Sequence, residues 1–442
     1  MAEAVQALRE RLAAQGVHTL LVQFTDVHGV AKGKWVPLEH LAEVIATGAG
    51  FAGPSIWGTG LGRTGARSEY FARGDVDAVQ VLPWMAGYAR IVGDGFVDGE
   101  PFDACPRQVL KRAVGRLAAR GWTLQTGIEP EFFLLRREEG GWRAADDRDR
   151  LDKPSYDLKS LPRQHAYLHA LREALEGAGM KVLQTDHEDA HGQFELNFEH
   201  ADALASADRL VLFKLAAHAL AERAGAVFSM MPKPFADQPG SGLHFHVSLW
   251  AGEQPLFATG DGTLAPLARH FIAGVLAHSA ALAALAAPTV NSYKRLVVGE
   301  SLSGTSWAPA HVAHGPNNRT ALVRTLEDRF EWRLPDASAN PYLALAGLIA
   351  AGLDGIDRAL DPGPACEDDL FALESAQIRA RGIPTLPQSL AEALDALAAD
   401  DVVRGALGEP LAREFDRLKR AEWIEYARHV SAWELERYVA AF

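Results

Sequence analysis

Charged and polar side chains recur two residues apart inside apolar stretches of this sequence. In a β-strand, residues i and i+2 point to the same face, so each such pair directs two polar groups at one place. One pair alone is equally well explained by the exposed face of an amphipathic strand, but four pairs predict a shared polar space. The pairs are Glu129 and Glu131, Gln193 and Glu195, His244 and His246, and Glu331 and Arg333, with Glu188 shortly before the second pair.

Carboxylates that face a common space repel one another unless cations lie among them. Sites that are rich in carboxylates and poor in sulfur suit Mg²⁺ or Mn²⁺ better than Zn²⁺. The sequence therefore predicts a site for hard divalent cations. Its candidate members are Glu129, Glu131, Glu188, Glu195, Glu331 and one imidazole, that of His244.

Basic residues that suit a phosphate group follow later in the chain. Guanidinium groups clamp phosphates and carboxylates through paired hydrogen bonds. Paired metals with convergent arginines are what in-line phosphoryl transfer requires. The candidates are Lys294, Arg295, Arg319, Arg324 and Arg333.

Local patterns predict an α+β protein that positions these residues. Strand-like alternation is present at 19–25, 31–37, 76–82 and 88–92, with a short helix at 40–47. Longer helical patterns follow at 108–119, 164–178 and 203–225. Single strands lie between these helices, which favours α+β architecture over a doubly wound sheet. We expect a small amino-terminal domain, residues 1–104, and a larger domain, residues 105–442.

Composition excludes several classes of protein. The chain has 57 acidic and 44 basic residues, and the net charge of −13 has the wrong sign for binding a nucleic-acid backbone. Cys105 and Cys366 match no zinc or redox spacing, which is typical of a reducing compartment. The amino terminus lacks the residue order of a secretion signal, so we expect a cytoplasmic protein.

Two segments resemble signals of other functions, namely a membrane-spanning helix and a nucleotide-binding loop. Residues 271–293 contain no Lys, Arg, Asp or Glu and approach the ~20 residues that span a bilayer. Because His278 and Pro288 interrupt this stretch, we expect a buried core helix. Residues 48–53 match the G-x-G-x-x-G nucleotide fingerprint, but a helical pattern precedes them, which predicts a glycine loop.

Five motifs resemble the glutamine synthetase family in order and spacing, and the resemblance covers essentially the whole chain. They occupy residues 127–132, 187–195, 231–246, 291–295 and 333–342. Further runs look like the branch of this family that contains glutamate–methylamine ligases. These runs are residues 47–53, 295–299, 302–309 and 428–434.

The resemblance implies a β-grasp amino-terminal domain and a catalytic domain whose curved antiparallel sheet forms a funnel. ATP would enter one end of the funnel and glutamate the other. The family also implies a homo-oligomer of six-membered rings, usually stacked as a dodecamer. In these rings, each site is completed by a neighbour's amino-terminal domain.

Matching motif positions also imply a role for each site residue. Glu131, Glu188 and Glu195 match the ligands of a first metal, and Glu129, His244 and Glu331 match those of a second. Arg319 and Arg324 match arginines that stabilise the transferring phosphate. Gly240, Arg295 and Arg333 match glutamate-binding positions, and His246, Ser248 and Arg324 match nucleotide-side positions.

Two positions depart from ammonia-using relatives, in which two carboxylates help to bind ammonium. Ala52 stands where the first acid is expected, and the register of the second acid lands on Ser301, with Glu300 one residue earlier. An alanine removes charge and frees volume for a methyl group, whose burial is worth roughly 0.8 kcal/mol. The expected amine pocket comprises Ala52, Ser55 and Ser301. Glu300 is either the base that deprotonates the amine or a solvated charge.

The resulting hypothesis is ATP-dependent ligation of the γ-carboxylate of L-glutamate to methylamine through γ-glutamyl phosphate. Glutamine synthesis from ammonia and ligation of a larger amine, such as ethylamine or a polyamine, remain open alternatives. A non-catalytic assembly or nitrogen-sensing protein on the same scaffold is a more remote one, because all six metal-ligand positions match.

Overall fold

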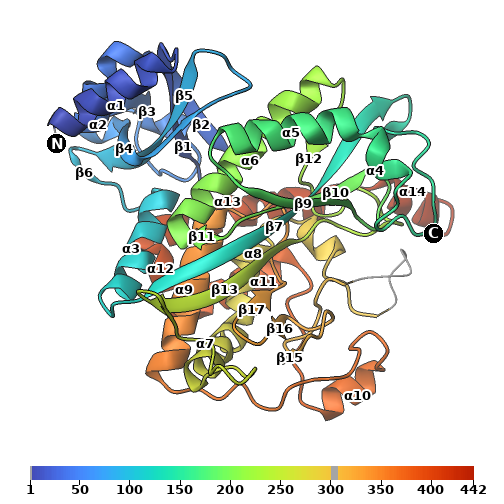
Figure 1. The fold of residues 1–442 in the computed structure, drawn as a ribbon. Coiled ribbons are helices and arrows are strands. Elements are labelled where there is room, and N and C mark those ends of the chain that lie inside the picture. Colours follow the sequence, from blue (N-terminus) through green and yellow to red (C-terminus); the bar gives the residue numbers. More distant parts are fainter. Residues whose placement is uncertain (1, 300–306) are drawn as a thin grey trace.

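The structure, a computed structural model, describes residues 2–299 and 307–442 (Figure 1). Its amino-terminal part is a mixed sheet whose strands run in the order β2-β1-β5-β4-β3, with β6 beside β5. Strand β1 lies parallel to β5, and the other neighbours are antiparallel. The elements are α1 (Ala2–Ala14), β1 (Thr19–Thr25), β2 (Ala31–Pro37), α2 (Leu41–Ala46), β3 (Ala49–Ala52), β4 (Glu69–Val81), β5 (Tyr88–Val97) and β6 (Glu100–Pro101).

The core of this part follows from the alternation along β1. Leu20, Val22 and Phe24 are buried in the same cluster as Leu8 and Leu12 of α1. An apolar residue at every second position buries one face of a strand. The strands expected in this part are therefore present, two of them as pieces of the longer β4 and β5.

Residues 48–53 contain an edge strand where a loop was expected. Gly48 follows α2 with a φ of +90°, and a Cβ at this position would lie 2.8 Å from the carbonyl oxygen of Ala72. Strand β3 then pairs with β4. Since a helix precedes the motif and a strand begins inside it, the glycines do not build a nucleotide-binding turn.

The larger part is built on a sheet in the order β15-β16-β17-β13-β7-β10-β9. The pairings are antiparallel except that of β15 with β16. The strands are β7 (Thr123–Glu138), β8 (Gly141–Ala144), β9 (Val182–His187), β10 (Gln193–Phe198), β11 (Ala201–Asp202), β12 (Val227–Ser229), β13 (Leu243–Ala251), β14 (Gln254–Pro255), β15 (His314–Pro316), β16 (Val323–Thr325) and β17 (Phe330–Trp332).

Helices cover this sheet and connect it to the amino-terminal part. Helix α6 packs on β7 and β12, and the almost entirely buried α9 packs on α3, α7 and α12. The helices are α3 (Pro106–Ala118), α4 (Ser160–Arg163), α5 (His165–Gly177), α6 (Ala203–Arg223), α7 (Pro266–Ala277), α8 (Ser279–Ala286), α9 (Pro341–Asp357), α10 (Ser375–Ala380), α11 (Leu390–Ala399), α12 (Asp401–Leu407), α13 (Glu409–Arg428) and α14 (Ala432–Tyr438). The short 3₁₀ helices are Leu38–His40, Gly53–Ser55, Ala66–Ser68 and Ser292–Lys294.

Asn340 joins the two parts while it caps α9. Its side-chain oxygen accepts a hydrogen bond from the Tyr342 amide at 3.1 Å, as an N-cap residue does. Its side-chain amide donates to the carbonyl oxygens of Asp26 and Val27 at 3.0 and 3.3 Å. The turn between β1 and β2 is thereby bound to the start of the largely buried helix α9.

The stretch 271–293 is not the single core helix that we expected. Helices α7 and α8 meet at His278 and are bent by 75° relative to each other. Most of their residues are buried, so the expectation of a core location is confirmed. Among the described helices, none alone is long and apolar enough to cross a membrane, and α7 with α8 reaches that criterion only as this bent pair.

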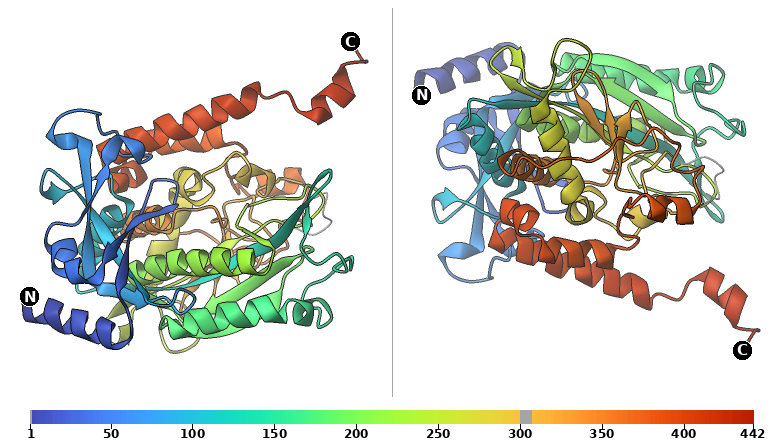
Figure 2. Two further views of the ribbon diagram at one scale, coloured as in Figure 1. Left: turned by 90° about the horizontal axis from the view of Figure 1, so that it is seen from above. Right: turned by 90° about the horizontal axis from the view of Figure 1, so that it is seen from below.

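The carboxyl-terminal helices α13 and α14 run along one side of the molecule, and α14 extends beyond it (Figure 2). Helix α14 has no buried residue, and the centroids of its exposed Trp433 and Tyr438 rings lie 5.8 Å apart. Exposed apolar side chains that lie close together are typical of a protein interface.

Candidate functional site

Strands β7, β10, β13 and β17 direct polar side chains into one cavity of about 1090 Å³. Their pairing explains the convergence, because residues opposite each other in neighbouring strands point to the same side. Glu131 lies opposite Glu195, Glu129 opposite His244, and Glu331 opposite His246. The structure thus gathers the predicted metal-site residues in a common space. The acidic and imidazole side chains that line it and were singled out in the sequence are Glu129, Glu131, Glu188, Glu195, His244, His246 and Glu331.

Glu131, Glu188 and Glu195 form the first candidate metal cluster, since each offers a ligand atom within 4.8 Å of the others. Burial and the neighbouring Glu131 raise the pKa of Glu188 to about 9. Burial and the other carboxylates also raise the pKa of Glu195 well above its ordinary value. Mutual repulsion of these acids favours a bound cation, and an all-oxygen donor set is what Mg²⁺ and Mn²⁺ prefer, so the residues fit a hard divalent cation.

Two hydrogen bonds orient the carboxylate of Glu131. The Gln193 side-chain amide and the Gly242 backbone amide donate to its Oε2 at 3.0 and 2.8 Å. The absence of a side chain at Gly242 is required, because a Cβ there would lie 2.6 Å from Nε2 of His244. The sequence analysis named Gln193 only as the polar residue two positions before Glu195 and gave Gly242 no role of its own.

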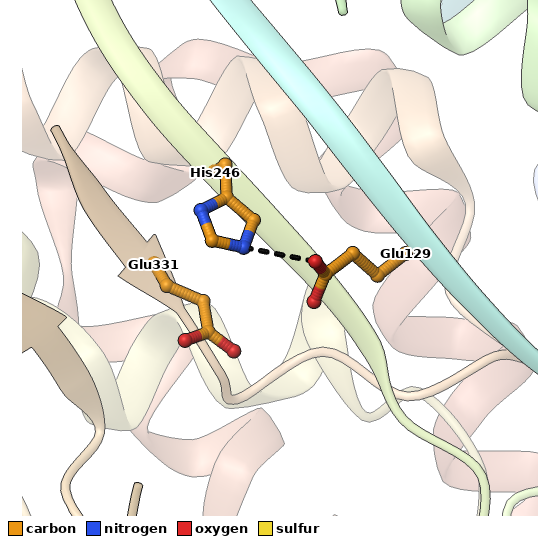
Figure 3. Close-up of side chains that lie close together, drawn as sticks. All are labelled: Glu129, His246 and Glu331. Carbon is orange, nitrogen blue, oxygen red and sulfur yellow. Dashed lines mark ion pairs between the residues drawn. The ribbon is translucent and has the colours of Figure 1, made fainter. Parts of the chain in front are cut away.

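A second candidate cluster contains Glu129 and Glu331, which come from β7 and β17 and face His246 of β13 (Figure 3). His246 Nε2 lies 3.1 Å from Glu129 Oε1. His244, the imidazole expected to be the ligand, also reaches both carboxylates, with Nδ1 3.7 Å from Glu129 and 3.5 Å from Glu331. Burial opposes ionisation of Glu129, but hydrogen bonds with His244 and His246 outweigh it and lower the pKa of this carboxyl.

Arginines bind the buried carboxylate of Glu331 from both sides. Arg324 Nη1 donates to Oε2 at 2.9 Å, and Arg333 donates to Oε1. Burial acts to raise the pKa of Glu331, but Arg333 and the imidazoles outweigh it and lower this pKa. Two positively charged guanidinium groups thus lie beside the negatively charged second cluster.

The other predicted basic residues also border the cavity. Arg295 is buried and donates to the carbonyl oxygens of Leu334 and Arg333 at 3.0 and 3.3 Å. Arg319 and Gly240 line the same cavity. The Gly240 carbonyl oxygen accepts a hydrogen bond from Gln193 at 3.1 Å, which links the loop before β13 to β10.

Several predicted residues lie elsewhere. In the part of the chain that the structure describes, Ser248 does not line the cavity, and its hydroxyl accepts a hydrogen bond from Trp250 at 2.9 Å. Ala52 and Ser55 are exposed on the amino-terminal part, away from the cavity of their own chain. Glu300 and Ser301 lie outside the described residues.

Asp186 is a cavity residue that the sequence analysis missed. It lies opposite Glu195 in the β9–β10 ladder, and burial together with the charges of Glu131 and Glu129 raises its pKa to about 6. The same two-residue spacing that selected the other acids relates Asp186 to Glu188. Applied to 182–188, that spacing would have found it.

Comparison with known proteins places these features in a family. A family model described as "Glutamine synthetase, catalytic domain" matches residues 103–438. The glutamate–methylamine ligase of Methyloversatilis universalis is 49% identical, over 100% of this chain and 99% of that protein. The glutamine synthetase of Rhizobium meliloti is 39% identical, over 95% of this chain and 96% of that protein.

Solved structures agree with these sequence matches. A GmaS–ADP complex has a TM-score of 0.91 at 38% identity, covering 98% of this chain and 99% of that one. A ligand-free GmaS structure has a TM-score of 0.88 at 37% identity, with the same coverage. The expected fold is confirmed, and the chain belongs to the glutamine synthetase family.

Proposed function

We propose that this protein is an ATP-dependent ligase that joins the γ-carboxylate of L-glutamate to a small primary amine, with methylamine as the preferred amine. The products are γ-glutamylmethylamide, ADP and phosphate. The observation that carries the proposal is the single cavity in which two acidic clusters adjoin several arginines. The 49% identity to a glutamate–methylamine ligase supports the choice of amine.

Two divalent cations, Mg²⁺ or Mn²⁺, would be held by the carboxylates and imidazoles of the two clusters. When bound, they supply the positive charge that stabilises a transferring phosphoryl group. The chain's own residues neutralise further charge on the phosphate and bind the substrate glutamate. Arg319 and Arg324 neutralise charge that develops on the phosphate, while Gly240, Arg295 and Arg333 hold glutamate.

The reaction has two steps. The γ-carboxylate of glutamate attacks the terminal phosphorus of ATP, which forms γ-glutamyl phosphate and releases ADP. The amine nitrogen then attacks the γ-carbonyl carbon, phosphate leaves, and the amine loses a proton. Glu300 remains a predicted proton acceptor, and among the described residues Asp186 is a further carboxylate in the cavity.

The amine pocket requires a second copy of the chain. Ala52 and Ser55 are exposed and lie away from the cavity of their own chain, which supports a role in a neighbouring subunit's site. We therefore propose a homo-oligomer of six-membered rings, stacked as a dodecamer. Together with Ser301, these residues would form a pocket that lacks the charge of an acid at position 52.

An amine panel tests the proposed function. The release of ADP is measured with glutamate, ATP and Mg²⁺ or Mn²⁺, and kcat/KM is compared for methylamine, ammonia, ethylamine and putrescine. We expect kcat/KM to be higher for methylamine than for ammonia. A preference for ammonia of about tenfold, equivalent to roughly 1.4 kcal/mol in transition-state binding, would instead identify a glutamine synthetase. Absence of turnover with every amine would contradict the ligase proposal.

A further inference from the structure

A buried histidine lies directly behind the first acidic cluster. His187 ends β9 immediately before Glu188, and none of its surface is exposed. Its Nδ1 lies 2.7 Å from the backbone carbonyl oxygen of Glu188, and its Nε2 lies 2.8 Å from Oδ2 of Asp149. The ring also packs edge-on against Phe194 of β10, with 5.0 Å between ring centroids. The imidazole is therefore held on three sides.

Asp149 reaches this histidine from the segment between β8 and α4. The same Oδ2 also accepts the Gly192 backbone amide at 2.6 Å, and its Oδ1 accepts the Ser160 hydroxyl at 3.2 Å. Asp149 itself is buried, at 4% exposure. One carboxylate thus binds both ends of the turn 187–192, the turn that carries Glu188.

The turn itself is closed by backbone hydrogen bonds. The Glu188 amide donates to the Gln193 carbonyl at 3.0 Å, and the Gln193 amide donates to the Ala190 carbonyl at 3.1 Å. In the described part of the chain, no other side chain donates a hydrogen bond to the Glu188 carboxylate, and its hydrogen-bonding neighbour is the backbone amide of Asp189 in the same turn. The direction of the Glu188 side chain is therefore set by the backbone of the turn, which Asp149 and His187 hold in place.

We propose that Asp149, acting through His187 and Gly192, is a positioning residue that orients Glu188 for the divalent cation of the first cluster. Groups that hold a metal ligand in place typically change metal affinity by about 10- to 100-fold when they are removed. The inference rests on the proposed function only in that a cation binds at Glu131, Glu188 and Glu195. None of the residues Asp149, His187 and Gly192 lines the cavity in the described chain, so their effect on the cation is indirect.

Metal affinity in the absence of turnover tests this role. The full-length chain is freed of metal and titrated with Mn²⁺ alone, with free Mn²⁺ measured by electron paramagnetic resonance. We expect Asp149→Asn to weaken one class of Mn²⁺ site by about 10- to 100-fold. His187→Gln, which replaces the two ring nitrogens by one amide group that cannot span both partners, should weaken the same class. The rise in Tm that Mn²⁺ produces should shrink in both variants.

A matched buried triad elsewhere in the chain separates positioning from general stability. His278 lies between Asp400 and Asp354, with ring nitrogens 2.6 and 3.0 Å from their carboxylates, and none of the three lines the cavity. His278→Gln should lower the Tm of the metal-free protein and leave Mn²⁺ affinity at the wild-type value.

Two results would overturn the inference in different ways. If the wild-type chain binds Mn²⁺ but Asp149→Asn and His187→Gln bind it equally well, the positioning role is wrong while the proposed function stands. If the wild-type chain binds no Mn²⁺, the proposed function fails with it. Should Asp149→Asn fold poorly, His187→Gln compared with His278→Gln decides the question alone.

Discussion

At the scale of single residues, the acids of the first cluster are held close together although their negative charges repel one another. Carboxylates that share a buried space favour their neutral forms, since each negative charge raises the energy of the next. The pKa of Glu188 is raised to about 9 by burial and Glu131. Near neutral pH, the metal-free site therefore retains protons that a cation must displace.

Proton release on metal binding is the first prediction. Because a metal binds the carboxylate and not the carboxylic acid, Mn²⁺ binding should release protons near pH 7, and affinity should rise between about pH 6 and pH 9. Isothermal titration calorimetry in buffers of different ionisation enthalpy measures the number of protons released. An apparent enthalpy that is the same in every buffer would contradict this expectation.

Asp186 carries the second prediction. Among the described residues, none donates a hydrogen bond to its side chain, which lies at the cavity wall. Near neutral pH, methylamine arrives as a cation, whereas hydroxylamine is a neutral nucleophile. We expect Asp186→Asn to raise the KM for methylamine about tenfold or more, because hydrogen bonds to charged groups are worth about 1.5–3 kcal/mol. The KM for hydroxylamine should change much less, and equal changes for both nucleophiles would contradict binding of the cation by Asp186.

At the scale of elements, the histidine at the bend between α7 and α8 contacts two carboxylates from other parts of the chain. His278 at the junction binds Asp400 at the start of α12 and Asp354 in α9. The hydrogen bond with Asp400, aided by that with Asp354, raises the pKa of His278 despite burial. The junction therefore joins α9 and α12 to the bend through an imidazole whose charged form the two carboxylates favour.

The third prediction follows from the sign of this pKa shift. A group whose pKa is raised by folding stabilises the folded state fully below its unfolded pKa of about 6.5, and this stabilisation is lost as pH rises through the folded pKa. His278→Gln should therefore lower the urea midpoint by the equivalent of about 1–3 kcal/mol near pH 6. The difference from wild type should diminish as pH rises above about 6.5 and through the raised folded pKa.

Tryptophan fluorescence during urea unfolding measures these midpoints. His165→Gln is the control, because His165 is exposed and, among the described residues, its ring hydrogen-bonds only with the Pro162 carbonyl. A deficit of His278→Gln that stays constant with pH would contradict the role of the protonated ring.

At the scale of the whole molecule, one arginine joins the amino-terminal sheet to the larger part. Arg107 of α3 is 3% exposed and binds Asp94 of β5 at 2.6 Å and Asp208 of α6 at 2.9 Å. It also binds Asp75 of β4 at 3.0 Å. The Tyr342 hydroxyl of α9 donates to the same Asp208 at 2.7 Å, so the network reaches the central helix.

Removal of this arginine is the fourth prediction. Arg107→Met would break the buried ion pair with Asp208, while Asp75 and Asp94 keep Lys111 as a partner, and breaking a buried pair typically costs about 3–5 kcal/mol. The urea midpoint should fall accordingly. Arg120→Met is the matched control, because Arg120 binds Asp357 through two hydrogen bonds of 2.6 and 2.8 Å at the surface. That exposed pair should contribute no more than about 1 kcal/mol, and equal losses in the two variants would contradict a special role for Arg107.

Much of the site could be inferred from the chain alone because the direction of a side chain along a strand is a local property. Alternation assigned Glu129 and Glu131 to one face, and likewise His244 and His246, before any neighbour was known. The motifs identified the family for a similar reason, because each motif is a short contiguous segment that can be recognised without the tertiary structure. Helix α6 was also predicted to within two residues at its end, because its apolar pattern is continuous over 21 residues.

Other features arose only when distant segments met. The pairing of His246 with Glu331 and the contact of Asp149 with His187 join residues that local alternation does not relate. At the bend, His278 contacts Asp354 and Asp400, which lie far along the chain, whereas the apolar stretch alone predicted one helix. Strand register and buried ion pairs are decided by the packing of the whole chain, and that packing has no signature within any single segment.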